Sequence, residues 1–180
     1  MRKILPNALT IFRVLAIPAV VSSFYVDYDY ARYVTLVIFL LACATDFLDG
    51  YLARAWGAQS RFGRLFDPVA DKLIVLSTFV MLVHVGRITG LCVACVVIVV
   101  CREVLVSGMR EFLIAANINL PVSNVGKFKT VAQMVSTGVL IISDGEVMTR
   151  IGEILLWGAA CLSVYSMYSY TRTAIEKTGI

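Results

Sequence analysis

Charged residues are scarce in this chain. Only 16% of its 180 residues are Asp, Glu, Lys or Arg, whereas 59% are apolar. A soluble domain has roughly 25% charged residues. The sequence also has no internal repeat, no low-complexity segment and no linker. This composition excludes an ordinary soluble domain, and it predicts one domain over residues 1–180 whose solvent is mostly lipid.

Histidine is nearly absent, and the cysteines do not form a recognisable metal motif. The chain has one histidine, His84, and five cysteines. Cys92 and Cys95 form a Cys-x-x-Cys motif, which alone could indicate redox chemistry or a zinc site. No second pair exists, so we interpret them as small apolar packing residues. No Ser, Cys or His constellation supports a covalent intermediate, and His84 is expected at an outer interface.

Six apolar runs are long enough to cross a bilayer, which takes about 20 residues of helix. They are approximately 8–26, 31–55, 65–85, 88–115, 127–143 and 147–171. Their short connections predict an all-α membrane protein, a bundle of six transmembrane helices. Residues 1–26 could instead be a cleaved secretory signal, because two cations precede an apolar core. Arg13 interrupts that core and five more spans follow, which favours a retained span.

Basic residues are distributed unevenly between the two ends of these spans. Three lie at one side, namely Arg32, Arg87 and Arg150. The other thirteen lie at or near the opposite side, namely Arg2, Lys3, Arg13, Arg54, Arg61, Arg64, Lys72, Arg102, Arg110, Lys127, Lys129, Arg172 and Lys177. Because basic residues collect on the cytoplasmic side, both termini are expected in the cytoplasm. The net charge of +4 is then a topology signal and an attraction to anionic lipid, and nothing indicates nucleic acid binding.

Four aspartates gather in one short segment of this apolar chain. Carboxylates at membrane depth are costly and persist where they pair, bind ions or line a wet cavity. Asp46 and Asp49 are three residues apart, and Asp67 and Asp71 are four apart, so each pair shares one helical face. Asp67-Pro68 is expected to start a helix. Residues 55–63 are expected to form a hairpin that lets the two acidic faces converge.

Converging carboxylates need cations to remain ionised. Arg54 and Lys72 could supply part of the compensation. Helix caps and interfacial ion pairs could explain two aspartates, but they explain four in register less well. A site with oxygen ligands and no His or Cys selects Mg²⁺ or Mn²⁺. Bridging carboxylates would permit two ions, the arrangement that clamps both oxygens of a phosphoryl displacement.

The spacing of these residues resembles the complete signature of the CDP-alcohol phosphotransferases. The motif is DxxDGxxAR from Asp46 to Arg54, followed after eight residues by GxxxDxxxD from Gly63 to Asp71. The resemblance implies a metal centre on the donor diphosphate, with Asp71 also acting as general base. Its four ligands would be Asp46, Asp49, Asp67 and Asp71.

The same resemblance implies a binding site for a CDP-diacylglycerol donor. Its residues would be Asn7, Thr10, Gly50, Arg54 and Ser60. Glycine at position 50 allows a ligand to approach the helix closely, and the Arg54 guanidinium can form a bidentate hydrogen bond with a phosphate. The stretch PNALT, residues 6–10, resembles the short amphipathic N-terminal segment with which the family covers the nucleotide. A helix start or interfacial cap explains Asn7 and Thr10 about as well.

The signature specifies the donor only, so polar residues outside the signature must determine which acceptor binds. Arg110 shares a face of the fourth apolar run with Glu103, and Lys127 begins the fifth run. Both are expected at the level of the aspartates, where they could bind an acceptor phosphate. For Arg102 and Lys129 we favour cations at the cytoplasmic flanks of the spans and an Arg–Glu ion pair between helices.

These segments, with PNALTIFR and RFGRLFDPVADKL, resemble the bacterial phosphatidylglycerophosphate synthase branch of the family. That branch implies glycerol 3-phosphate as acceptor, a homodimer, and an inner-membrane protein whose site faces the cytoplasm. Serine, inositol phosphate or phosphatidylglycerol remain alternative acceptors. A divalent-cation carrier is an alternative of another class, because membrane aspartates can mark ion paths. The outer halves of the spans offer few ionisable groups to continue such a path.

Overall fold

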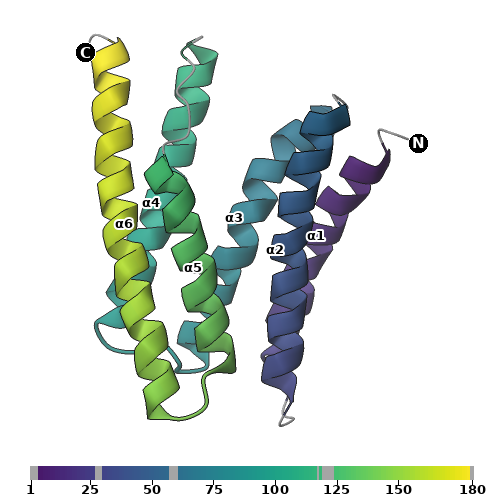
Figure 1. Ribbon diagram of the computed structural model, residues 1–180, viewed down its shortest axis with the longest axis vertical. Helices are drawn as coiled ribbons and strands as arrows, with labels where there is room; N and C mark the ends of the chain where they lie inside the picture. The colour runs from purple at the N-terminus through teal and green to yellow at the C-terminus, as the bar shows by residue number, and fades with distance from the viewer. Residues whose placement is uncertain (1–3, 27–29, 57–60, 117, 119–123, 179–180) are drawn as a thin grey trace. The chain divides into compact units, whose positions relative to one another are not determined.

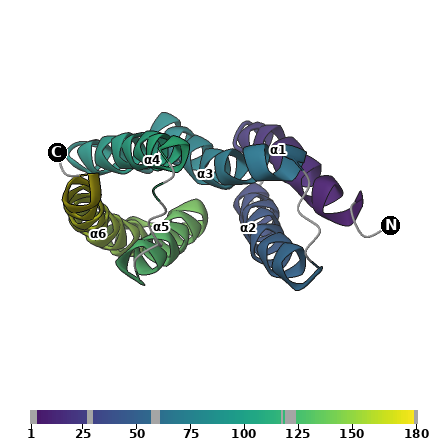
Figure 2. The same ribbon diagram turned by 90° about the horizontal axis from the view of Figure 1, so that it is seen from above.

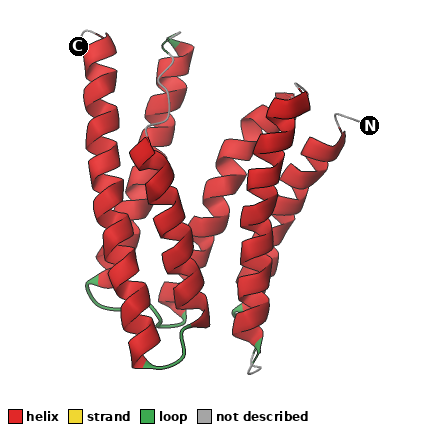
Figure 3. Cartoon of the chain, in the orientation of Figure 1, coloured by secondary structure: helices red, strands yellow, loops and turns green. Residues whose placement is uncertain are grey.

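Among the described residues, every regular secondary-structure element is an α-helix, and loops join the helices (Figure 3). The computed structural model describes residues 4–26, 30–56, 61–116, 118 and 124–178, and within these it leaves the side chains of 4–11, 13, 46–56, 61–71, 124 and 178 undescribed. This part contains six helices. They are α1 (Ile4–Ser23), α2 (Ala31–Trp56), α3 (Arg61–His84), α4 (Cys92–Ala115), α5 (Asn124–Ile142) and α6 (Glu146–Thr178).

Helix α3 begins earlier than the sequence pattern indicated. It starts at Arg61, so the expected helix start at Asp67-Pro68 is wrong. A proline inside a helix removes one backbone hydrogen bond, but its fixed φ is compatible with helical geometry. Helix α1 likewise continues through Pro18. The connection between α2 and α3 is therefore residues 57–60, shorter than the expected hairpin of residues 55–63, and it lies outside the described residues.

Helix α1 also begins earlier than expected. It runs without a break from Ile4 to Ser23 and therefore includes the whole PNALT stretch. Those residues form the first turns of α1 and are not a separate N-terminal segment. A proline interrupts the hydrogen bonds of a helix only beyond the first turn. The apolar residues on both sides of the PNALT stretch therefore allow one continuous helix.

The helices form two compact units, Met1–Val85 and Gly86–Ile180. In the first unit α1 packs against both α2 and α3, and α2 also contacts α3 (Figure 1). Val20, Phe39 and Phe79 are fully buried there. The hydroxyl of Thr35 donates to the Ser23 hydroxyl at 2.8 Å, which ties the end of α1 to the first turns of α2.

In the second unit α6 packs against both α4 and α5 (Figure 2). Helices α4 and α6 run in the same direction and α5 runs in the opposite one (Figure 1). Helices α5 and α6 approach closely at Gly152, where an added Cβ would lie 2.6 Å from the Leu140 side chain. Leu140 and Leu156 are fully buried in this unit.

The loop before α4 forms hydrogen bonds with the C-terminal end of α5. Gly86 and Gly90 adopt positive φ values of 72° and 55°, a conformation that favours glycine. Between them, the Arg87 guanidinium donates to the Leu140 carbonyl at 2.9 Å and also to the Ile141 carbonyl. The last carbonyls of a helix have no partner within it. Arg87 therefore caps the C-terminus of α5.

Three helices are long and apolar enough to cross a membrane, among the residues whose side chains are described. They cover Cys92–Ala115, Val125–Ile142 and Glu146–Lys177. The described apolar stretches of the first unit are shorter, at Val14–Ser23, Ala31–Thr45 and Lys72–His84. The expected all-helical architecture is confirmed for the described part. Six spans and cytoplasmic termini stay predictions.

Candidate functional site

The four signature aspartates lie on two contacting helices. Asp46 and Asp49 belong to the C-terminal part of α2, and Asp67 and Asp71 to the N-terminal part of α3. Because both segments are helical, the spacings of three and four residues place each pair on one face. The chain turns back between α2 and α3, so both pairs are near the same end of this unit (Figure 1). Their side chains lie outside the described part of the structure.

Four of the five residues expected to bind the donor belong to helices near one end of the first unit. Gly50 and Arg54 lie in α2, four residues apart. Asn7 and Thr10 lie in the first turns of α1, which begins at the end where α2 stops (Figure 1). Ser60 lies outside the described residues. The helices that carry the expected donor residues all contact one another.

The composition of this region fits a hard divalent cation. The signature offers four carboxylates and neither histidine nor cysteine between Asp46 and Asp71, which is the ligand set preferred by Mg²⁺ and Mn²⁺. Among the described side chains, no group of three or more His, Cys, Asp or Glu residues could hold a metal ion. Cys92 and Cys95 are buried in the core of the second unit, as expected for packing residues.

The expected acceptor residues lie in the second unit. Arg110 is half-buried near the C-terminal end of α4, and Lys127 is exposed near the start of α5. These two ends are at the same end of the unit (Figure 1). Lys129 is buried although it is only two residues from Lys127. Two residues correspond to about 200° around a helix, so the two lysines face different surroundings.

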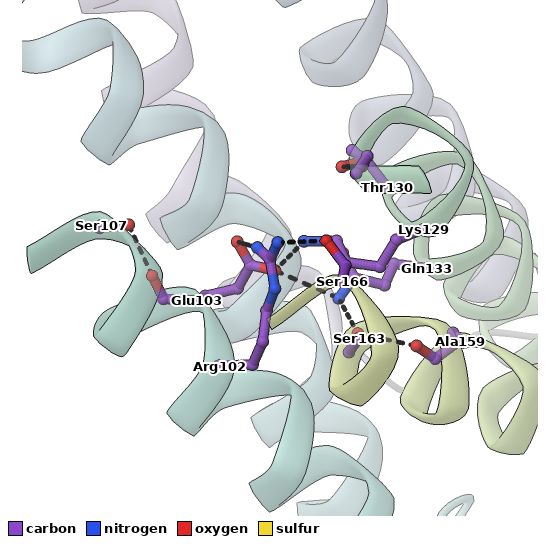
Figure 4. A network of polar contacts seen from close by, with 10 residues as sticks. Arg102, Glu103, Ser107, Lys129, Thr130, Gln133, Ala159, Ser163 and Ser166 are labelled. Atoms are coloured by element: carbon purple, nitrogen blue, oxygen red, sulfur yellow. Dashed lines mark hydrogen bonds and ion pairs between the residues drawn. The ribbon is translucent and has the colours of Figure 1, made fainter. Parts of the chain in front are cut away.

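A buried polar cluster joins the three helices of the second unit (Figure 4). At its centre the Glu103 carboxylate of α4 accepts hydrogen bonds from Lys129 of α5 and, at 3.4 Å, from the Arg102 guanidinium. The side chains of Lys129, Glu103 and Arg102 are only 3%, 8% and 10% exposed. The sequence predicted an Arg–Glu ion pair between helices. Arg102 instead contacts Glu103 of its own helix, and the ion pair between helices is formed by Lys129 and Glu103.

Neutral polar side chains extend this cluster to α6. Arg102 donates to the Ser166 hydroxyl at 2.8 Å, and the Gln133 amide donates to Glu103 and to Ser163, each at 3.4 Å. Sequence reasoning did not identify Ser163 and Ser166. The available signal was their spacing of three residues, which places both hydroxyls on one face of an apolar helix.

Comparison with known proteins places the chain among lipid-synthesising transferases. The family model for CDP-alcohol phosphatidyltransferase matches residues 3–165 and so extends across both units. Curated relatives named CDP-diacylglycerol–glycerol-3-phosphate 3-phosphatidyltransferase include one from Rickettsia felis, 41% identical over 172 residues that cover 93% of each chain. The relative from Haemophilus influenzae is 38% identical and covers 94% of this chain and 92% of its own.

A plant relative extends this similarity beyond bacteria. The Arabidopsis thaliana protein named CDP-diacylglycerol–glycerol-3-phosphate 3-phosphatidyltransferase 2 is 37% identical over 182 residues, covering 93% of this chain and 78% of its own. The family match spans most of the sequence, and it includes the aspartate signature on α2 and α3. The chain therefore belongs to the CDP-alcohol phosphatidyltransferase family.

Proposed function

We propose that this protein transfers the phosphatidyl group from CDP-diacylglycerol to glycerol 3-phosphate, forming phosphatidylglycerophosphate and CMP. The observation that carries the proposal is the identity of about 40% to relatives named for this reaction, over 93% of the chain. The position of the aspartate signature at one end of two contacting helices supports it.

The donor binds at the end of the first unit where the aspartates lie. Asp46, Asp49, Asp67 and Asp71 hold Mg²⁺ or Mn²⁺, in the proposed arrangement as two ions. When bound, the cations neutralise negative charge on the diphosphate and on the departing CMP. The family is generally dependent on divalent cations, which supports the assignment. Asn7, Thr10, Gly50, Arg54 and Ser60 bind the rest of the CDP moiety.

The reaction is a direct displacement at phosphorus. Asp71 accepts a proton from a glycerol hydroxyl, and that oxygen attacks the phosphorus that carries diacylglycerol. A new oxygen–phosphorus bond forms as the bond to CMP breaks, and CMP leaves with the electron pair. Arg110 and Lys127 bind the phosphate of glycerol 3-phosphate through charge-assisted hydrogen bonds. Most of the rate enhancement then comes from positioning and from neutralising charge.

The proposed setting is the bacterial inner membrane, with the site on the cytoplasmic side. The three candidate spans of the second unit support membrane residence. The thirteen basic residues on one side against three on the other support the orientation. The family match across residues 3–165 supports one functional domain over residues 1–180. We propose a homodimer on the family resemblance alone.

The acceptor can be tested with purified protein in detergent micelles. CMP release from CDP-diacylglycerol would be measured with glycerol 3-phosphate, free glycerol, serine, inositol phosphate and phosphatidylglycerol as separate acceptors. We expect release with glycerol 3-phosphate and little with the others. Equal use of serine would contradict the acceptor assignment. Metal flux into vesicles without CMP release would favour the cation carrier.

A further inference from the structure

The polar cluster around Glu103 has no part in the chemistry proposed above. Glu103 lies near the middle of α4, twelve residues before its end at Ala115. Ionisable side chains at the centre of a membrane-spanning helix are costly and commonly have a function. Here two cations, Arg102 and Lys129, surround one carboxylate in a buried place. This arrangement calls for an explanation beyond packing.

The cluster links a pair of helices that do not otherwise pack closely. Helix α6 packs against α4 and against α5, but among the described residues α4 and α5 do not pack against each other. The contact between Glu103 and Lys129 crosses from α4 to α5 through two long side chains. Arg102 and Ser166 connect α4 to α6 at 2.8 Å. The cluster therefore determines the position of α5 relative to α4.

The same contacts specify the rotation of α5 about its own axis. Lys129 is directed at Glu103, and Lys127 is about 200° further around the helix, where it is exposed. Arg110 follows Glu103 by seven residues, or about 10 Å along the same face of α4. A rotation or shift of α5 that separated Lys129 from Glu103 would change the direction of Lys127 relative to Arg110.

We propose that Glu103 is a positioning residue for the acceptor, acting through Lys129 on the placement of Lys127 relative to Arg110. The inference rests on the proposed function, which assigns the acceptor phosphate to these two cations. Buried ion pairs are weak contributors to stability, but a buried polar group can specify one register among several. An apolar layer at this level would permit several rotations of α5 with similar packing.

Two variants separate positioning from stability. Glu103→Gln keeps the size of the side chain and removes the carboxylate that pairs with Lys129. The triple variant Arg102→Met, Glu103→Met and Lys129→Met removes every charge and keeps apolar volume, a replacement that often preserves stability. Glu176→Gln is the matched control, because Glu176 is exposed and pairs with Arg172 at 2.9 Å on the surface of α6.

Kinetics are measured in detergent micelles together with thermal unfolding. We expect both test variants to raise KM for glycerol 3-phosphate about tenfold or more, because displacing a binding group by about 1 Å can cost up to 10²-fold in rate. KM for CDP-diacylglycerol should stay near its original value. The triple variant should show this change while keeping the thermal stability of the unaltered protein. Glu176→Gln should change none of these quantities.

The helix placement can also be measured without activity. Spin labels at Glu111→Cys and Phe128→Cys, both exposed positions, report the distance between the ends of α4 and α5 when the five native cysteines are replaced by alanine. We expect the distance distribution to shift or broaden in Glu103→Gln and in the triple variant. If the unaltered protein does not use glycerol 3-phosphate, the proposed function fails and this distance alone decides the positioning role. Unchanged distances, or unchanged acceptor KM in a folded and active triple variant, would overturn it.

Discussion

Asp46 is expected to be a metal ligand, and its loss should stop the reaction. Asp46→Ala removes one carboxylate from the α2 pair, and we expect no measurable CMP release from a protein that still extracts and purifies as before. Chelation of divalent cations should have the same effect on the unaltered protein. Asp144→Ala is the control, because Asp144 is an exposed aspartate between α5 and α6. Full activity after thorough chelation would remove the metal assignment.

Asp71 is expected to accept the proton of the attacking hydroxyl. Asp71→Asn keeps the shape of the side chain but removes the basic oxygen, so turnover should fall at least ~10²-fold. Because Asp71 is also an expected metal ligand, binding of CDP-diacylglycerol is measured in parallel. Retained donor binding with lost turnover is the expected pattern. Turnover near that of the unaltered protein would refute the role.

Arg110 and Lys127 are expected to bind the acceptor phosphate. A charge-assisted hydrogen bond contributes ~1.5–3 kcal/mol, so Arg110→Ala or Lys127→Ala should lower kcat/KM for glycerol 3-phosphate roughly 10- to 150-fold. Donor binding should change little, since other residues bind the CDP moiety. CMP release is measured against acceptor concentration at saturating donor. Arg172→Ala, an exposed arginine of α6, serves as control, and unchanged acceptor kinetics in both test variants would rule out the phosphate site.

At the residue scale, spacing predicts shared faces better than it predicts partners. The intervals between the four aspartates predicted which positions lie on one face, because α2 and α3 are helical there. An ion pair between helices was expected for an arginine and a glutamate, whereas the structure forms it between Lys129 and Glu103. The contact between Gln133 and Ser163 was not predictable, because a serine in an apolar helix can satisfy its hydroxyl locally. Ser163 indeed donates to the Ala159 carbonyl at 2.7 Å in the preceding turn.

At the element scale, hydropathy predicts where apolar stretches end and not where helices end. The last apolar run was expected over 147–171, whereas α6 continues to Thr178. Its final turns are polar and are supported by the ion pair between Arg172 and Glu176. The start of α3 was missed for a related reason. Helix can continue through a proline when the turns on both sides are stable, and the residue pattern alone does not show that they are.

Gly152 is expected to be required for the close packing of α5 on α6. In Gly152→Ala the new methyl group would lie 2.6 Å from Leu140, whose side chain is fully buried. We expect a loss of ~1–3 kcal/mol in the free energy of unfolding, the usual cost of overpacking. Gly158→Ala is the matched control, because the added Cβ meets nothing within 4 Å and alanine favours helix by ~1 kcal/mol. Unfolding in detergent measures both, and a Gly152→Ala protein as stable as Gly158→Ala would contradict the packing argument.

At the scale of the whole molecule, the expected orientation places both chain ends in the cytoplasm. Thirteen of the sixteen basic residues are expected at or near that side, because basic residues are retained there during insertion. In cells, an impermeant thiol reagent should therefore reach Asp144→Cys from outside, since this loop joins α5 to α6. Lys177→Cys, near the end of α6, should be labelled only after permeabilisation. The reverse pattern would invert the topology.

The arrangement of charges around Glu103 also has a consequence for biogenesis. A buried lysine in an inserting helix is costly unless it is paired. Lys129 lies five residues after the start of α5, and α5 has the lowest hydropathy of the three candidate spans, 1.2 against 2.2 for Cys92–Ala115. Because α4 is synthesised first, Glu103 is already present when α5 emerges from the ribosome. The acid on the earlier, more apolar helix thus offers a counter-charge to the later, less apolar one. A nascent chain that stopped after α4 would carry the acid into the bilayer without Lys129.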